Sequence, residues 1–583
     1  MKKNKLLSVV LIFLCALLIL AGCGKEAEES ESSLLTIAKE KTTEFKVVNF
    51  LEDDQQVRAF LADLLIKTGA KYSIVDAKDA GASAFYIGTA QQFAENGIEG
   101  GTTGYSTYSI KVDNGNIYVC MGLEAMAEDV LTLLKNSIIK QDDGSFCIDG
   151  AFDVSKDLSE ISEVVPMFQT EKGKFRDLHD VGNGNYQASY YDLDPVDGPH
   201  EVAAYESSLL AEGYTLWQDN EIGANRFATY YRGDTQIHIN YFDVMKEFRI
   251  VYGPKRYLPE NNKPVTEYEE LIEPTVSIIE GTENVLCMVI QLADGTFWVI
   301  DGGWDSVSLQ SKTVNAGAKN EFKVEYKRDS VKDMQVLYDF MKERTPGGGN
   351  PQVTWMITHA DPDHILLPVR FIKDYAGKFD LNTIVYNFPN LYNIKLGEGG
   401  GSTNDPMIMT SYYESFLYQA NQNYPNVNHY VYHAGEKLYI PGGEVEFLFA
   451  AGEDSWPKTM YWMNHTSGVW RFTIDGRTIM ITGDAETSIC NQMVGVFGDY
   501  LKSEILQVNH HGANGATLSF YRKIAPIMTF WGCQQYHLDH DNRQRGVSSS
   551  YLFNRYLWQK DDIIGYYSNT ETHTVRIRTL EEE

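Results

Sequence analysis

The stretch "VTWMITHADPDHI" (residues 353–365) decides how the C-terminal half of the chain is interpreted. It begins with an apolar run of the kind found in buried strands, and it then places two histidines and two aspartates within a few positions. One interpretation is an acidic turn with two solvated histidines. The other is a metal site, because neutral imidazole and carboxylate together suit zinc, manganese or iron.

Three further apolar runs share this arrangement, because each predicts a strand that ends in residues able to bind or orient a metal ion. Chemistry of the same type at four separate strand ends favours the metal site over solvated histidines. The three runs and their terminal residues are "NVLCMVIQLADGTFWVIDGG" (284–303, Asp301), "NHTSGVWRFTIDGRTIMITGDAE" (464–486, Asp484) and "EILQVNHHGANG" (504–515, His510 and His511).

The order of these motifs resembles the metallo-β-lactamase superfamily, and more closely the extracytoplasmic hydrolase domain of the ComEC-type DNA-uptake proteins. The chain carries Asp-Gly-Gly, HxDxDH, "TGD" and "HHG" in that order, within residues 276–580. The resemblance implies an α/β fold, an αβ/βα sandwich with two divalent metal ions at the edges of its sheets. Zinc is the first expectation for both ions, with manganese or iron as alternatives.

The resemblance also implies a role for each motif residue. Asp301 would orient ligands by hydrogen bonds from beneath the site. In the "HHG" motif the histidine before glycine, His511, is preferred as a ligand, and His510 is the alternative. The sequence departs from the family at Asp361, where the wider superfamily has histidine. By motif position, His359 and Asp361 would bind the first ion with His465 as a candidate third ligand, Asp363 and His364 would bind the second, and Asp484 would bridge both.

Two divalent ions that share a carboxylate lower the pKa of a water between them, so the expected chemistry is hydrolysis by a metal-bound hydroxide. Asp363 is a candidate to accept a proton from it. His537 and His540, in "CQQYHLDHDN" (533–542), are candidate donors to the substrate oxyanion. A polar loop with incidental histidines explains them equally well. The Gly-rich "LGEGGGSTNDP" (396–406) is either a mobile lid or an ordinary loop.

The expected substrate is a phosphodiester or a similar ester. A lactone or amide hydrolase of the same fold is one alternative, and a non-catalytic surface-binding lipoprotein is the other. The formal net charge of −30, from 80 acidic and 50 basic residues, disfavours long nucleic acid as a partner. A small molecule or an ester of the cell envelope fits this charge better.

The N-terminus predicts export rather than a folded element. The basic "MKKNK" precedes a long apolar stretch, and "LAGC" (residues 20–23) resembles the bacterial lipobox. We expect a signal peptide over residues 1–22, lipid on Cys23, and an acidic, Ser-rich tether over residues 23–44. The protein would then be anchored by lipid at the extracytoplasmic face of the cell membrane. A plain transmembrane anchor is the alternative.

At 583 residues the chain exceeds one ordinary core, so several modules are expected. Ten of the 13 histidines lie after His238, which assigns the chemistry to the C-terminal half. The alternation of predicted helices and strands sets the boundaries. We expect a small α/β module over 45–150, an α+β module over 151–257, a linker over 258–275 and the hydrolase domain over 276–583.

Overall fold

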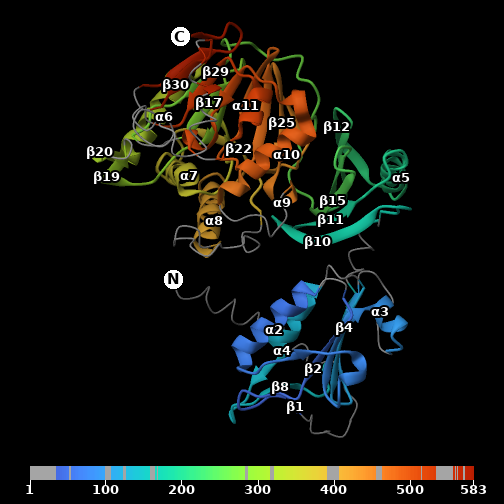
Figure 1. Ribbon diagram of the computed structural model, residues 1–583. Helices are drawn as coiled ribbons and strands as arrows, with labels where there is room; N and C mark the ends of the chain where they lie inside the picture. The colour runs from blue at the N-terminus through green and yellow to red at the C-terminus, as the bar shows by residue number, and fades with distance from the viewer. Residues whose placement is uncertain are drawn as a thin grey trace. The chain divides into compact units, whose positions relative to one another are not determined.

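The computed structural model confirms a mixed α/β chain and divides it into two compact units, Met1–Ile161 and Ser162–Glu583. Figure 1 labels the helices and strands. Among the described residues, no helix is long and apolar enough to cross a membrane. The structure describes residues 34–51, 54–98, 107–122, 127–157, 165–166, 168–282, 286–315, 321–389, 406–454, 463–513, 515–533, 556–557, 560, 562–568 and 571–583.

The first unit is built on a six-stranded sheet of order β3-β2-β4-β6-β5-β9 and a small sheet of order β1-β8-β7. Its core contains Leu64 of α2, Phe85 of β4 and Leu134 of α4, all fully buried. The elements are β1 (Leu34–Ala38), β2 (Lys46–Asn49), α2 (Gln55–Thr68), β3 (Ser73–Ile74), β4 (Ala84–Thr89), α3 (Ala90–Glu95), β5 (Thr107–Asp113), β6 (Asn116–Met121), α4 (Ala127–Ser137), β7 (Ile139–Lys140), β8 (Phe146–Asp149) and β9 (Asp153–Asp157).

The first unit extends beyond the boundaries expected from the sequence at both ends. β1 pairs with β8, so part of the stretch expected as a tether, residues 23–44, belongs to the fold. β9 pairs with β5, which carries the unit past residue 150. Both strands are short and β9 is polar, so their local sequence resembles a linker. Only the pairing with distant strands makes them part of the sheets.

The second unit contains two large sheets, of eight and seven strands (Figure 1). The order is β23-β22-β21-β18-β17-β16-β31-β32 in the first and β24-β25-β26-β27-β28-β29-β30 in the second. The strands of the first are β16 (Thr275–Ile278), β17 (Cys287–Gln291), β18 (Phe297–Asp301), β21 (Gln352–Met356), β22 (Asp380–Tyr386), β23 (Asn428–Val431), β31 (His573–Arg576) and β32 (Glu581–Glu582). Those of the second are β24 (Lys437–Ile440), β25 (Gly443–Phe449), β26 (Val469–Ile474), β27 (Arg477–Ile481), β28 (Ile505–Gln507), β29 (Met528–Trp531) and β30 (Ile564–Tyr567).

These two sheets pack face to face, and helices cover both outer faces. Along β18, Val299 packs toward the outer helices, whereas Ile300 packs between the sheets. Successive strand residues point to opposite faces, and both faces of this strand are buried. The sequence of β18 is therefore an almost continuous apolar run. The helices are α6 (Ser330–Arg344), α7 (Pro362–Asp374) and α8 (Pro406–Asn423) on the first sheet, and α10 (Thr487–Phe497) and α11 (Leu518–Ile524) on the second.

A third, antiparallel sheet of order β10-β11-β15-β14-β13-β12 carries the helix α5 (Gly198–Ala211). It joins the other two sheets through buried ion pairs, such as Arg249 Nη1 to Asp454 Oδ1 at 2.6 Å. β19 (Val307–Asn315) and β20 (Glu321–Asp329) form a separate two-stranded ribbon. The strands of the third sheet are β10 (Lys174–Gly182), β11 (Asn185–Tyr191), β12 (Thr215–Ile222), β13 (Asn225–Arg232), β14 (Thr235–Phe242) and β15 (Glu247–Pro254).

Candidate metal centre

The parallel strands of both large sheets end at the place where the predicted ligands gather. β18 ends at Asp301, β21 leads to His359, β27 leads to Asp484, and β28 leads to His511. In α/β sheets, sites form at the carboxyl ends of parallel strands. Two groups of three side chains have ligand atoms that all lie within 4.8 Å of one another: His359, His364 and Asp484, and Asp363, His364 and His511.

Asp301 lies beneath this cluster and is fully buried. Its carboxylate accepts hydrogen bonds from the Thr358 amide at 2.8 Å and the Thr358 hydroxyl at 2.7 Å. It also lies 2.9 Å from His364 Nδ1. Because Nδ1 faces Asp301, the ring presents Nε2 to the cluster, 3.3 Å from Asp484 Oδ1. Asp301 thereby fixes which ring nitrogen of His364 faces the cluster, and its role in orienting a metal ligand stays a prediction.

The two glycines after Asp301 make this turn possible. A Cβ atom on Gly302 would lie 2.5 Å from Cδ of Pro368 in α7. Gly303 has φ of +113°, and its carbonyl accepts the Leu367 amide at 2.8 Å. Pro368 has no N–H and therefore interrupts the helix ladder here. The Asp-Gly-Gly turn thus docks directly on the helix that carries Asp363 and His364.

His511 is held from behind in the same way as His364. Its Nδ1 lies 2.7 Å from the Gly532 carbonyl, so Nε2 faces the cluster. Nε2 lies 3.4 Å from Asp363 Oδ2 and 3.2 Å from His364 Nε2. The side chain is 3% exposed. His511 is therefore a buried candidate ligand.

The neighbouring His510 lies at the rim, with its side chain 26% exposed. Its Nε2 is 3.6 Å from Asp484 Oδ2 and 3.0 Å from the side-chain nitrogen of Asn464. Both histidines have left-handed backbones, with φ of 47° for His510 and 52° for His511. This tight turn aims the two adjacent rings at different points.

His359 supplies the test of whether a metal ion fits. Its Nδ1 lies 3.0 Å from the Thr358 hydroxyl, while its Nε2 is buried without a hydrogen-bond partner. Nε2 lies 3.7 Å from Asp361 Oδ2 and 4.0 Å from Asp484 Oδ2. Buried polar atoms are almost always paired. A divalent cation between the imidazole and the two carboxylates would satisfy this nitrogen, so the donor set fits a metal ion.

The charges of the cluster support the same interpretation. Burial opposes ionisation here, but the Asp484 and Asp301 carboxylates outweigh it and raise the pKa of His364 well above its usual value. His364 and His511 likewise hold the pKa of Asp484 well below its usual value. Burial also opposes ionisation of Asp363, but the hydrogen bond with His511 and the charges of His364 and His511 together outweigh it and lower the pKa of Asp363 to about 2. The ionised carboxylates therefore attract positive charge to this place. A bound divalent cation would take that role and leave the imidazoles neutral, which is the form that ligates a metal ion.

The other predicted residues fall into two classes. Asp361 is the N-cap residue of α7 and lies beside His359, and His465 lies in the short helix η7 (Met463–Thr466). Neither of them belongs to a group of three. Three residues, His537, His540 and the lipidation candidate Cys23, lie outside the described residues, as does most of the Gly-rich stretch.

Sequence reasoning missed residues that support the cluster without facing it. Gln507, at the end of β28, accepts from the Thr482 amide at 2.8 Å and donates to the Gly483 carbonyl at 3.1 Å. The Ser467 hydroxyl accepts from the Asp484 amide at 3.1 Å. Their only signal in the sequence is that each lies within a few positions of a motif residue.

No family model and no curated protein matches the chain by sequence. Among solved structures, CmlA, a diiron β-hydroxylase from Streptomyces venezuelae, is similar at 12% identity with a TM-score of 0.29, covering 56% of this chain and 55% of that one. A mutant of the CmlA β-hydroxylase is similar at 11% identity with a TM-score of 0.28, covering 53% and 55%. The chain thus spans about half the length of these proteins, and scores this low do not establish a common fold.

Proposed function

We propose that this chain is a hydrolase that uses two divalent metal ions, with a metallo-β-lactamase-type domain of the ComEC-like subgroup. The proposal is supported by one observation above all. Imidazoles and carboxylates from four separate strand ends converge on a buried cluster in which His359 Nε2 has no protein partner. The two face-to-face sheets with helices outside agree with the αβ/βα sandwich that the motifs imply.

The geometry suggests how the ligands divide. Bound divalent ions would lower the pKa of a coordinated water and polarise a substrate oxygen. Asp301 and the Gly532 carbonyl hold two of the imidazoles in place, and Asp363 is exposed enough to accept a proton from the nucleophile. In this assignment His359 and Asp361 would hold the first ion, Asp363, His364 and His511 would hold the second, and Asp484 would serve both. Zinc is the first candidate for both, with manganese or iron as alternatives.

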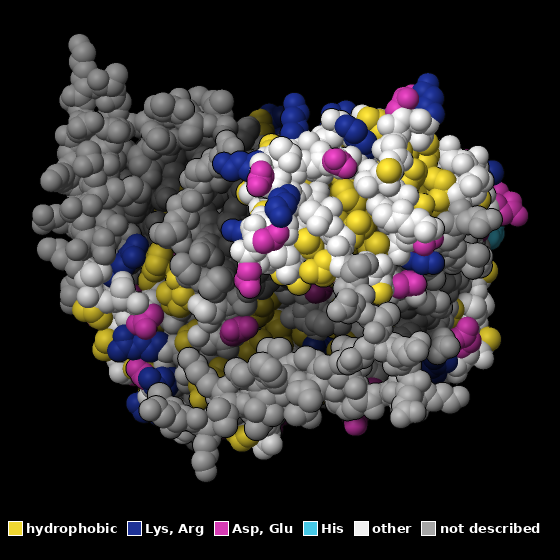
Figure 2. Space-filling model, turned by 90° about the horizontal axis from the view of Figure 1, so that it is seen from below, with side chains coloured by type: hydrophobic (Ala, Val, Ile, Leu, Met, Phe, Trp, Pro, Cys, Tyr) yellow, Lys and Arg dark blue, Asp and Glu magenta, His cyan; other side chains and the backbone are white. Residues whose placement is uncertain are grey.

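For the substrate we propose a phosphodiester or a similar ester of modest size. Figure 2 shows one face of the molecule, on which basic and acidic side chains are interspersed over the described residues. Together with the net charge of −30, this gives no general attraction for long polyanions. We also propose, from the lipobox-like sequence, that lipid on Cys23 holds the protein at the extracytoplasmic face of the cell membrane.

The test combines metal analysis with hydrolysis of bis(p-nitrophenyl) phosphate by the purified chain. We expect two divalent ions per chain and a phosphodiesterase activity that a chelator removes. The double variant Asp484→Ala/His364→Ala should lose both, because it removes the bridging carboxylate and an imidazole shared by both groups of three. Asp339→Ala, an exposed change on α6, is the matched control.

Two outcomes would contradict the proposal. A chain that binds no divalent ion after supplementation would exclude the metal centre. A double variant with the activity of the wild type would exclude the assigned residues. Hydrolysis of lactones or amides without hydrolysis of phosphodiesters would instead support the other hydrolase class.

A further inference from the structure

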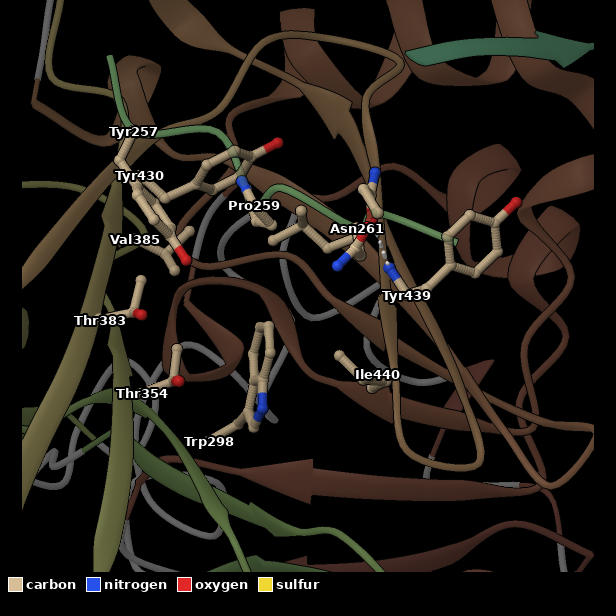
Figure 3. Close-up of a pocket in the computed structure, with 12 residues that line it drawn as sticks. Tyr257, Pro259, Asn261, Trp298, Thr354, Thr383, Val385, Tyr430, Tyr439 and Ile440 are labelled. Atoms are coloured by element: carbon tan, nitrogen blue, oxygen red, sulfur yellow. Dashed lines mark hydrogen bonds between the residues drawn. The ribbon is translucent and has the colours of Figure 1, made fainter. Parts of the chain in front are cut away.

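A cavity of about 140 Å³ lies at the opposite end of the same strands from the metal cluster. Its lining comes from β18, β21, β22, β23, β24 and the segment over residues 257–262 (Figure 3). Thr354 in this lining belongs to β21, and the candidate ligand His359 follows it by five residues. This separation corresponds to roughly 15 Å of extended chain. The cavity is therefore separate from the candidate metal centre.

A row of hydrogen-bonding side chains crosses the sheet at this cavity. Trp298 of β18 pairs in register with Thr354 of β21, which pairs with Thr383 of β22. The next row, with Ile300 and Met356, belongs to the apolar core between the sheets. An inner sheet face is expected to be apolar, so two threonines at successive positions of one row are unusual here.

These side chains have unused hydrogen-bonding groups. Neither threonine hydroxyl bonds to another described residue, and both threonine side chains are half-buried. The Trp298 indole N–H also has no partner among the described residues, and this side chain is only 7% exposed. In Figure 3 both threonines line one side of the cavity, with Trp298 beside them. Hydrogen-bonding groups that open into a cavity and have no protein partner are available to a ligand with hydroxyl or carbonyl oxygens.

The opposite wall is fixed in place. Trp217 of the third sheet donates its indole N–H to the Pro259 carbonyl at 2.9 Å. Asn262 donates to the Lys437 carbonyl at 2.8 Å and accepts from the Tyr439 amide at 3.0 Å. The segment over residues 257–262 is thus held by hydrogen bonds to the third sheet and to β24. The cavity is part of the folded structure, already shaped before a ligand enters.

The lining has a clear chemical character. Aromatic rings come from Trp298, Tyr257, Tyr430 and Tyr439, and the described lining residues include no acidic, basic or imidazole side chain. Aromatic faces with a few neutral polar groups suit a ring that is apolar on its faces and polar at its edge. The volume is close to that of an engineered cavity of about 150 Å³ that accepts benzene, so it accommodates one six-membered ring, and the exocyclic groups of a sugar would have to lie at its opening.

We propose that this cavity binds one pyranose ring of a neutral sugar, through stacking on the aromatic side chains and hydrogen bonds to Thr354, Thr383 and Trp298. A charged sugar is excluded, because its carboxylate or amine would lose water without gaining an ionic partner. The site would hold a glycan independently of the metal centre. If the chain is a hydrolase of the cell envelope, as proposed above, this site would hold it on a glycan near its substrate.

The test is a titration of the full-length chain with glucose and with N-acetylglucosamine. Binding is measured by isothermal titration calorimetry and by saturation-transfer NMR. We expect at least one of them to bind saturably with a Kd on the order of 1–10 mM. Glucuronate should bind at least about tenfold more weakly, which corresponds to roughly 1.4 kcal/mol. The variant Asp484→Ala should bind the sugar as the wild type does, because it changes only the metal centre.

The decisive variant is Thr354→Val/Thr383→Val, which keeps the shape of the row and removes its hydroxyls. We expect affinity for the sugar to fall at least about tenfold while the unfolding temperature does not fall. Thr473→Val, a half-buried threonine on β26 outside the cavity, should change neither. Absence of saturable binding by either sugar would overturn the proposal. So would equal affinity in the double valine variant, or cyclohexanol binding as tightly as the sugars.

Discussion

At the scale of single residues, the candidate centre depends on how its imidazole rings are held from behind. Asp301 faces Nδ1 of His364, and the Gly532 carbonyl faces Nδ1 of His511, so both rings present Nε2 to the cluster. The motif order predicted the two histidines and Asp301. Gly532 could not be predicted, because it lies 21 residues from His511 and acts through its backbone.

The difference between His510 and His511 gives the prediction at this scale. We expect His511→Ala to lose one of two bound ions, because it removes a buried ring that lies close to both Asp363 and Asp484. His510→Ala should keep both ions, because that ring lies at the rim beside Asn464. Metal content by mass spectrometry, at matched protein concentration, checks this. Loss of metal in His510→Ala alone would reverse the assignment of the "HHG" motif.

At the scale of elements, the turns at the strand ends decide where the ligands lie. The sequence predicted each strand and its terminal residues, because hydrophobic periodicity and turn residues act locally. It did not show that Gly302 packs on Pro368, or that Pro368 interrupts α7 where the Gly303 carbonyl docks. Those contacts join segments that are far apart in the chain.

Gly302→Ala tests this docking. The added Cβ meets the proline ring and cannot be relieved by a flexible side chain, so we expect a loss of about 1–3 kcal/mol in unfolding free energy. The matched control is Gly349→Ala, where φ is −69° and a Cβ meets nothing within 4 Å. That control should be neutral or stabilise the chain by up to about 1 kcal/mol. Equal stability of both variants in urea would contradict the docking.

The start of α6 gives a prediction about pH. Burial raises the pKa of Asp333 to about 6, and hydrogen bonds from Thr282 only partly offset it. The folded chain therefore binds this proton more tightly than the unfolded chain. The resulting stabilisation is complete below about pH 4 and is lost as the pH rises through about 6.

Asp333→Asn removes this titration and keeps the shape of the side chain. Between pH 4 and 7 the wild type should lose up to about 3 kcal/mol of unfolding free energy relative to the variant. Chemical unfolding at several pH values measures the difference. The exposed change Asp339→Asn should follow the wild type, and a constant difference between wild type and Asp333→Asn would refute the prediction.

At the scale of the whole molecule, the third sheet of the second unit is joined to the other two by buried charge. Arg249 of β15 contacts Asp454 Oδ1 at 2.6 Å and Glu247 Oε1 at 2.8 Å, with all three side chains buried. His433 Nδ1 contacts Glu453 Oε1 at 2.7 Å beside them. The sequence analysis expected residues 151–257 as a module of its own, whereas the structure makes the third sheet share its interior with the two large sheets.

Arg249→Met should therefore destabilise the second unit by about 3–5 kcal/mol, because it leaves two carboxylates buried without their cation. All nine tryptophans follow residue 161, so tryptophan fluorescence during urea unfolding reports this unit alone. Lys523→Met, which removes an exposed partner of Asp499, is the control and should cause no comparable loss. A small effect of Arg249→Met would mean that the sheets are held together mainly by apolar contacts.

By itself, the sequence predicted the mixed α/β character, the strands that lead to the candidate ligands and the residue types of the candidate metal centre, because spacing and periodicity act over a few residues. Export, lipid on Cys23 and the roles of His537 and His540 remain predictions from sequence. Only the tertiary structure decided that β1 and β9 belong to the first unit, that the third sheet docks through ion pairs, and that Trp298 and Thr354 face a cavity. Each of these depends on pairing between distant segments, which no local pattern records.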